Sequence, residues 1–315
     1  MPERLGDPLE TPLFERVAII GIGLIGSSIA HAVRQKNLAG SIVAIDRDTE
    51  VAARVDALGL ADAIFSDVAE GVKGCDLVIL CVPVGACGPV AKQMAASLRE
   101  GVIVTDVGSV KGAVVASMEP HLPAHAHFIP GHPVAGTEQS GPDAGFATLF
   151  HERWCILTPA YGVDPAAVAR LQEFWEGMGA RIEFMSAPHH DLVLAITSHV
   201  PHLIAYNIVG TAADLEQVTQ SEVIKFSAGG FRDFTRIAAS DPTMWRDVFL
   251  NNKEAVLEMI SRFNEDLAAL ARAIRWDDGD ALYDLFSRTR SIRRSIIDLG
   301  QETDAPDFGR RPGKD

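Results

Sequence analysis

The sequence predicts an α/β fold, with an N-terminal Rossmann-type doubly wound parallel sheet followed by an all-helical C-terminal dimerisation domain. Short apolar runs alternate with helical patterns between residues 17 and 186, as in a parallel sheet with crossover helices. The runs are too short for helices and do not alternate strictly, so we expect strands that are buried on both faces. Beyond Ser186 the strand pattern stops and long helical patterns follow.

These patterns predict the elements in chain order. Strands are expected at residues 17–20, 41–45, 77–82, 102–105, 128–130, 155–158 and 181–185. Helices are expected at 27–34 and, in the second half, at 188–207, 215–227, 242–274 and 280–299. Pro242 suits a first helical position, with Ser240 and Asp241 before it as candidate caps, and Gly300 suits the end of the last helix.

Length and composition bound the class of protein. The chain has 315 residues, enough for about two domains. With 42 acidic and 28 basic side chains its formal net charge is -14, which disfavours nucleic acid and anionic membranes as partners. The polar N-terminus does not resemble a signal peptide, we expect no membrane-spanning stretch, and the four cysteines lack C-x-x-C spacing. These features predict a cytoplasmic protein with reduced thiols.

Residues 21–26 form the first motif that carries chemistry. The sequence Gly-Ile-Gly-Leu-Ile-Gly follows a predicted strand and opens a helical pattern, which is the context in which a G-x-G-x-x-G turn binds a dinucleotide. Gly21 permits the tight turn, Gly23 lets a pyrophosphate approach the helix N-terminus, and Gly26 lets helix and strand pack closely. We expect the intervening Leu24 and Ile25 to contact the cofactor as well.

Asp46 ends the second predicted strand, twenty positions after the last glycine of the motif. A carboxylate there accepts hydrogen bonds from ribose hydroxyls and repels a 2′-phosphate, which favours NAD over NADP. Arg47 leaves an alternative open, because it could stack on adenine or accommodate a phosphate. Ligands of such sheets lie at the carboxyl ends of strands, so the later strand ends add Val82, Pro83 and Asp106 as cofactor-binding candidates.

His132 lies in the segment Gly-His-Pro-Val-Ala-Gly-Thr-Glu at 131–138. Pro133 and the two glycines predict a rigid turn that holds this histidine near a ligand. An imidazole with an ordinary pKa near ~6.5 suits a proton acceptor at neutral pH. Ser109 and Lys111, after the strand at 102–105, are further site candidates, with a plain loop and an exposed lysine as the alternative.

Two histidines and two arginines of the second half are candidate substrate ligands. His199 and His202 share one face of a predicted helix that an intervening proline should kink. Helix packing and metal binding are the alternatives, and we expect no metal because no third ligand lies at a usual spacing. Arg232 and Arg236 lie close together in an acidic chain and suit a substrate carboxylate. An exposed helix face with Asp233 as ion-pair partner is the alternative.

Together these segments resemble the prephenate and arogenate (cyclohexadienyl) dehydrogenases of tyrosine biosynthesis. The likeness rests on the glycine turn followed by two serines, on Asp-Val-Gly-Ser-Val-Lys at 106–111, on the segment at 131–138, on Ser-His-Val-Pro-His at 198–202 and on Phe-Arg-Asp-Phe-Thr-Arg-Ile-Ala at 231–238. The resemblance spans residues 16 to 300. It implies oxidative decarboxylation of prephenate or arogenate with NAD, and any inhibition by tyrosine is expected to be competitive at the active site.

The resemblance also implies roles for individual residues. His132 takes the proton of the ring hydroxyl while hydride leaves the same carbon, and Ser109 assists at that hydroxyl. Arg236 binds a substrate carboxylate. The other residues expected at the substrate are His202 facing its side chain, Glu138 and Asp233 forming an ionic gate near Arg236, and His199, Arg232, Thr137 and Trp245.

The expected segments are a flexible N-terminus at 1–15, a dinucleotide-binding domain at 16–187, a helical substrate and dimerisation domain at 188–300, and a disordered tail at 301–315. We expect a homodimer, because the second half carries more apolar surface than a small helical layer can bury. Packing of these helices on the first domain is the alternative.

Two other functions remain open from the sequence. A β-hydroxyacid dehydrogenase or imine reductase would share both halves, but the helical lysine usual there is absent between residues 188 and 220. A non-enzymatic NAD-binding sensor would keep the glycine turn and Asp46, yet it would have no use for His132 and Arg236 in one site.

Overall fold

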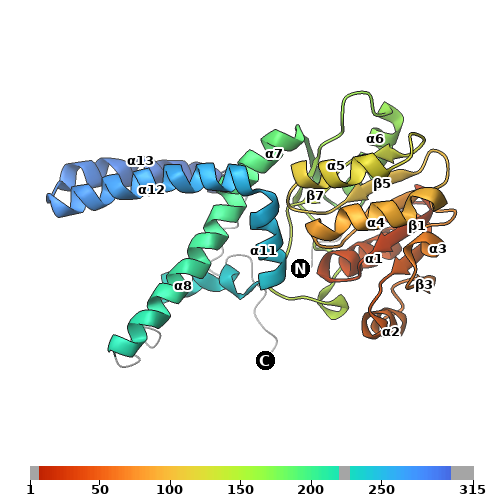
Figure 1. Ribbon diagram of the computed structural model, residues 1–315, viewed down its shortest axis with the longest axis horizontal. Coiled ribbons are helices and arrows are strands. Elements are labelled where there is room, and N and C mark those ends of the chain that lie inside the picture. The colour runs from red at the N-terminus through yellow and green to blue at the C-terminus, as the bar shows by residue number, and fades with distance from the viewer. Residues whose placement is uncertain (1–6, 220–227, 299–315) are drawn as a thin grey trace. The chain divides into compact units, whose positions relative to one another are not determined.

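The computed structural model describes residues 7–219 and 228–298 (Figure 1). The chain divides into two compact units, with the division at Leu257. The expected helix at 215–227 falls largely, and Gly300 and the tail at 301–315 fall entirely, outside the described residues. The domain boundaries at residues 15, 187 and 300 stay predictions.

A six-stranded parallel sheet forms the centre of the first unit, in the order β3-β2-β1-β4-β5-β6. This is the strand order of a doubly wound dinucleotide-binding fold. The chain adds strands outward from β1 on one side and outward from β4 on the other. The predicted fold class is confirmed. The strands are β1 (Phe14–Ile20), β2 (Ala39–Ile45), β3 (Ala63–Phe65), β4 (Leu77–Leu80), β5 (Ile103–Asp106) and β6 (His127–Phe128). β3 was not predicted, because its three residues are too few for a recognisable pattern.

Helices cover both faces of this sheet (Figure 1). Along β1, Val17 and Ile19 belong to one core cluster, whereas Ala18 and Ile20 belong to the other. This confirms that the strand is buried on both faces. The helices of this part are α1 (Leu24–Lys36), α2 (Thr49–Ala57), α3 (Val68–Gly71), α4 (Cys87–Met94), α5 (Gly112–Met118) and α6 (Pro165–Gly177), with short 3₁₀ turns η1 (Val84–Ala86), η2 (Ala95–Ser97), η3 (Glu119–His121) and η4 (Pro142–Ala144).

A second, three-stranded sheet follows, in the order β7-β8-β9. It consists of β7 (Gly131–Pro133), β8 (Trp154–Leu157) and β9 (Arg181–Phe184), and β7 runs antiparallel to β8. Two expectations are corrected. The last predicted strands do not extend the parallel sheet, and His132 lies on an edge strand paired with Ile156 instead of in a turn. Pro133 is tolerated there because an edge strand can end without a backbone donor.

One long helical stretch begins the second half. It consists of α7 (Ala187–Leu194), the π-helical turn η5 (Ala195–His199) and α8 (Val200–Thr219). The distortion expected at Pro201 takes the form of this π-helical turn, because proline supplies no N–H to the carbonyl four residues before it. Such π-helical turns are frequent at functional sites.

Four further helices and one 3₁₀ turn complete the described chain. They are α10 (Gly229–Thr235), η6 (Arg236–Ala239), α11 (Pro242–Asn251), α12 (Lys253–Arg275) and α13 (Gly279–Asp298). The expected helix at 242–274 is wrong, because the helix is interrupted at Asn252, whose side chain bonds elsewhere in the core. The predicted start is confirmed, since the Asp241 carboxylate caps α11 by accepting from the N–H groups of Thr243 and Met244.

The helical stretch Ala187–Leu215 is long and apolar enough to cross a membrane. This corrects the expectation that the sequence holds no such stretch. Length and composition are weak evidence for a span, because a core helix of a soluble protein meets the same criteria. The stretch also carries His190, Asp191 and His199, which are buried and hydrogen-bonded within the protein.

Packing at the glycine turn yields a test of the fold. A Cβ on Gly26 would lie 2.2 Å from the carbonyl oxygen of Gly21, whereas a Cβ on Gly23 would meet nothing within 4 Å. Gly26→Ala should therefore push α1 from β1 and destabilise the protein by about 1–3 kcal/mol. Gly23→Ala should cost less, about 0.5–1 kcal/mol, because its Cβ meets nothing and only the poorer N-cap preference of alanine counts against it. Urea unfolding of both variants measures this, and equal midpoints would contradict the close packing.

Candidate functional site

The carboxyl ends of four parallel strands lie along one edge of the large sheet. Ile20 is in register with Ile45 on one side and with Leu80 on the other, and Leu80 is in register with Asp106. The residues that directly follow these strands therefore gather at the same edge. This is where doubly wound folds bind their ligands.

The glycine turn after β1 leaves an anion-binding helix end open. Gly23 precedes the first turn of α1 and offers no side-chain cap to its N–H groups, which include those of Leu24 and Ile25. Gly21 adopts φ +89°, and a Cβ there would lie 2.7 Å from the Cys81 carbonyl oxygen. Since the space at Gly23 is free, the backbone fits a dinucleotide pyrophosphate.

Asp46 lies beside this turn with its carboxylate held from both sides. Its Oδ2 accepts from the N–H of Ile22 at 3.0 Å, and its Oδ1 accepts from the N–H of Asp48 at 3.0 Å. Each oxygen keeps acceptor capacity for a ribose hydroxyl. Arg47 and Pro83 are exposed and Val82 is half-buried, so all three are accessible to a cofactor at this edge.

A buried ion pair joins the loop after β5 to β7. Lys111 is fully buried and forms an ion pair with Asp106, and its Nζ donates to the carbonyl of Gly131 at 2.6 Å. The alternative of an exposed loop lysine is therefore wrong. Asp106 also accepts from the N–H of Gly108 at 2.8 Å. The Asp106 side chain is fully buried. This corrects the expectation that it contacts the cofactor. Asp106 supports the loop that carries Ser109, which is half-buried.

His132 lies next to this ion pair and is 7% exposed. Its Nδ1 is 2.8 Å from Nε2 of His190, and the two rings meet edge to face. Burial lowers the pKa of His132 well below its usual value, and His190, Lys111 and His199 lower it further. The imidazole is therefore neutral at pH 7. Its Nε2 makes no hydrogen bond within the described part of the chain, so this atom is left for a ligand.

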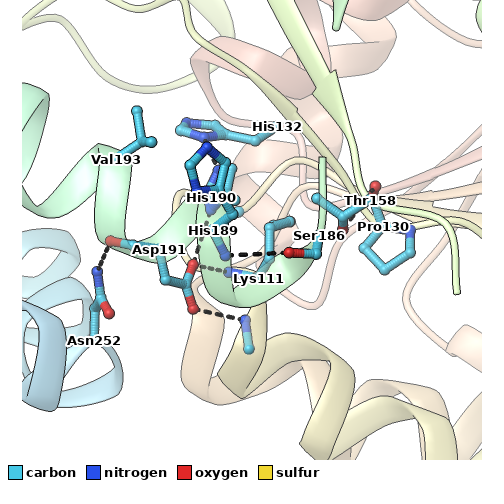
Figure 2. Close-up of polar contacts among 12 residues, drawn as sticks. Lys111, Pro130, His132, Thr158, Ser186, His189, His190, Asp191, Val193 and Asn252 are labelled. Atoms are coloured by element: carbon cyan, nitrogen blue, oxygen red, sulfur yellow. Dashed lines mark hydrogen bonds and ion pairs between the residues drawn. The ribbon is translucent and has the colours of Figure 1, made fainter. Parts of the chain in front are cut away.

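His190 and Asp191 are site residues that the sequence analysis missed (Figure 2). Nδ1 of His190 is 2.8 Å from Oδ1 of Asp191. The same carboxylate accepts from the N–H of Lys111 at 2.7 Å and from the N–H of Gly112 at 2.8 Å. The run His-His-Asp at 189–191, at the start of an apolar helix, is a signal that could have identified them.

Electrostatics agree with this arrangement. Burial lowers the pKa of His190, so that it too is neutral at pH 7. For Asp191, burial raises the pKa, but the hydrogen bonds from His190, Lys111 and Gly112 outweigh it and the net shift is downward. The pair therefore consists of a neutral imidazole and a carboxylate.

His199 and His202 lie on α7–α8 against Trp245 of α11. His199 is fully buried, and its Nδ1 is 3.1 Å from Nδ2 of Asn252. Burial lowers its pKa to about 4, so this ring is neutral at pH 7. His202 stacks on Trp245 with ring centroids 3.6 Å apart. Its Nδ1 donates to the Ser198 carbonyl, so Nε2 of the neutral ring is the acceptor. Among the described residues no group of three or more His, Cys, Asp and Glu could hold a metal.

Arg236 and Glu138 come together across 98 positions of sequence. Nη1 of Arg236 donates to Oε2 of Glu138 at 2.9 Å, with side chains 45% and 33% exposed. The arginine thus pairs with a distant residue, which argues against the alternative of a helix face paired locally. Arg232 is exposed and Asp233 half-buried on α10, and Thr137 is exposed next to Glu138.

Comparisons with known proteins match both halves of the chain to one family. The family models for the nucleotide-binding and dimerization domains of prephenate dehydrogenase match residues 29–184 and 186–288. The cyclohexadienyl dehydrogenase of Zymomonas mobilis is 44% identical over 284 residues, which cover 90% of this chain and 97% of that protein. The prephenate dehydrogenase of Bacillus subtilis is 34% identical over 283 residues, which cover 90% and 76%.

A solved structure is similar over the same length. The crystal structure of prephenate dehydrogenase from A. aeolicus in complex with hydroxyphenyl propionate and NAD+ superimposes with a TM-score of 0.83 at 35% identity. The match covers 90% of this chain and 98% of that one. Because both domain models match this chain and it covers 97% of the Zymomonas mobilis protein, this chain belongs to the prephenate dehydrogenase family.

Proposed function

We propose that this protein catalyses the NAD-dependent oxidative decarboxylation of prephenate to 4-hydroxyphenylpyruvate, of arogenate to tyrosine, or of both, in tyrosine biosynthesis. The observation that carries the proposal is the buried, neutral His132, whose Nε2 is left for a ligand beside the loop of Ser109. The names of the relatives, which include prephenate and cyclohexadienyl dehydrogenases, support the substrate class.

In the proposed mechanism His132 removes a proton and Ser109 orients the group that loses it. The substrate hydroxyl donates to Nε2 of His132, with the Ser109 hydroxyl as its second partner. The hydroxyl proton passes to Nε2 as the hydrogen on the same carbon leaves with both electrons. NAD, when bound at the glycine turn and Asp46, supplies the hydride acceptor. The bond from the ring to its carboxylate then breaks and carbon dioxide leaves. The electron pair of that bond passes through the ring to the ketone oxygen, which takes back the proton from Nε2 of His132 as the ring becomes aromatic.

Arginine and the aromatic stack hold the substrate in this proposal. Prephenate carries two carboxylates, and Arg236 offers a guanidinium fork in a chain of net charge -14. Its present partner Glu138 would yield to a substrate carboxylate, and Asp233 lies one helical turn away. His202, stacked on Trp245, is proposed to present Nε2 to the substrate side chain. Thr137, Arg232 and His199 are proposed as further substrate contacts.

The assembly belongs to the proposal as well. Five apolar side chains of the stretch Ala187–Leu215 are exposed in the single chain: Leu192, Ile196, Ile208, Val209 and Leu215. A larger number of exposed apolar side chains along one helical stretch is typical of a protein interface, so a homodimer through the helical half is proposed. A cytoplasmic location and competitive inhibition by tyrosine are proposed on the same basis as the substrate.

One assay separates the candidate functions. Absorbance at 340 nm would follow NADH with prephenate, arogenate and a set of 3-hydroxyacids offered separately. Turnover of prephenate or arogenate alone supports the proposal, and turnover of 3-hydroxyacids alone would establish the rival dehydrogenase. NAD binding without any turnover would indicate a sensor.

Cofactor choice should depend on Asp46. The wild-type protein should prefer NAD, because the carboxylate bonds the ribose and repels a 2′-phosphate. Asp46→Ser should weaken or reverse this preference, since Arg47 beside it can then receive the phosphate. The ratio of kcat/KM for NAD to that for NADP measures this in both proteins. A wild-type preference for NADP would contradict the assignment.

Substrate affinity should depend on Arg236. Arg236→Gln removes a charged hydrogen-bond donor worth about 1.5–3 kcal/mol, so the KM for prephenate should rise roughly 10- to 100-fold. NAD binding should change little. Arg246→Gln, which alters an exposed arginine paired with Asp247, is the matched control. Equal loss of substrate and NAD affinity in Arg236→Gln would indicate a structural arginine.

The pH dependence should report His132. Only the neutral imidazole accepts a proton, so the rate of the hydride step should fall as pH drops through the His132 pKa. Because burial lowers that pKa below 6.5, the acid limb should lie below pH 6.5. His132→Asn should lower kcat on the order of 10²–10⁴-fold and lose this limb. Stopped-flow absorbance across pH tests this, and a variant with near-native turnover or the same limb would rule out His132 as the base.

A further inference from the structure

We propose that His190 and Asp191 are positioning residues that fix the proton of His132 on Nδ1 and thereby keep Nε2 as its proton acceptor. The catalytic use of this arrangement rests on the proposed function. The proton positions themselves follow from the hydrogen bonds alone.

The hydrogen bonds join Asp191 to His190 and His190 to His132, and the direction of each follows from the Asp191 carboxylate. Asp191 receives two backbone N–H groups, one on each oxygen, and therefore acts as an acceptor. Nδ1 of His190, 2.8 Å from Oδ1, must then carry a proton and donate it. In a neutral ring this leaves Nε2 of His190 as an acceptor. Since that atom is 2.8 Å from Nδ1 of His132, the proton of His132 must lie on Nδ1.

The alternative tautomer would disable the site. An imidazole side chain in water favours the proton on Nε2, which would direct an N–H instead of a lone pair at the substrate hydroxyl. The contact with His190 opposes this tautomer. With the proton on Nε2 of His132, the lone pairs of His132 Nδ1 and His190 Nε2 would face each other 2.8 Å apart in a buried site. After His132 gains a proton at Nε2, the same bond becomes charge-assisted, with the Asp191 carboxylate at its far end.

Asp191 also connects the base to the loop that carries Ser109. Its two oxygens hold the N–H groups of Lys111 and Gly112 at the start of α5. Its own carbonyl accepts from Nδ2 of Asn252 at 2.9 Å, so the interruption between α11 and α12 fixes it from the other side. One carboxylate therefore sets the tautomer of His132 and the start of the helix that follows Ser109.

The wild-type protein supplies the first test. Long-range proton–nitrogen NMR correlations on histidine labelled with ¹⁵N distinguish the two neutral tautomers of each ring. At pH 7 both His132 and His190 should carry the proton on Nδ1, with their signals assigned from the spectra of His132→Asn and His190→Phe. A proton on Nε2 of His132 in the wild-type protein would overturn the proposal, whatever the variants do.

The second test removes the acceptor and keeps the ring. In His190→Phe the His132 signal should change to the Nε2 tautomer, and kcat should fall on the order of 10–10³-fold with the KM for prephenate nearly unchanged. A merely structural role would not produce this change of tautomer. His189→Phe, which alters the exposed neighbour, is the matched control and should keep native kcat and tautomers.

The two tests keep separate failures apart. A His190→Phe variant that retains the Nδ1 signal of His132, or near-native kcat, would contradict the positioning role. If that variant does not fold, the wild-type spectrum still decides. The protein could show the predicted tautomers and yet turn over neither prephenate nor arogenate. That result would contradict the proposed function but would support the proposed proton positions.

Discussion

A charged carboxylate in a protein interior requires hydrogen-bond donors. The donors that Asp191 recruits come from different parts of the site and hold those parts together. Asp191 draws two backbone donors from the start of α5 and one ring donor from His190. Removing any one would leave a buried charge short of a partner, which is costly. The start of α7, the loop after β5 and the ring of His132 are therefore held in one geometry.

The same constraint operates between Asp106 and Lys111. Both side chains are fully buried, and the lysine also donates to the Gly131 carbonyl. Gly131 directly precedes His132, so this ion pair fixes the edge strand that carries the base. A buried pair of this kind contributes little net stability compared with apolar packing. Its effect here is positional, because it ties the end of the large sheet to the start of the small one.

Much of the fold was predictable from the sequence, because the buried strands and the glycine turn are local patterns. The turn at 21–26, Asp46 at the end of β2 and the alternating elements needed no long-range information. The small sheet was missed because its pairing of β7 with β8 joins residues far apart in sequence. The break at Asn252 was missed for the same reason, since its partners lie on α7 and η5.

Site residues were predictable where their chemistry and local sequence are distinctive. They were missed where only their position in the folded chain gives them a role. His132 and Arg236 stood out by composition and local context. His190 looked like one polar residue of an apolar helix, and only the fold places its ring against His132. For Lys111 the loop sequence left a site residue and an exposed lysine open, and only the structure shows that it is buried between the Asp106 carboxylate and the Gly131 carbonyl.

A crystal structure of this protein with NAD and hydroxyphenyl propionate would test the central claim most directly. We expect the phenolic oxygen about 2.6–3.2 Å from Nε2 of His132, the carboxylate on Arg236, and the pyrophosphate at the N-terminus of α1. A phenolic oxygen bound away from His132, with that ring in contact only with protein, would contradict it.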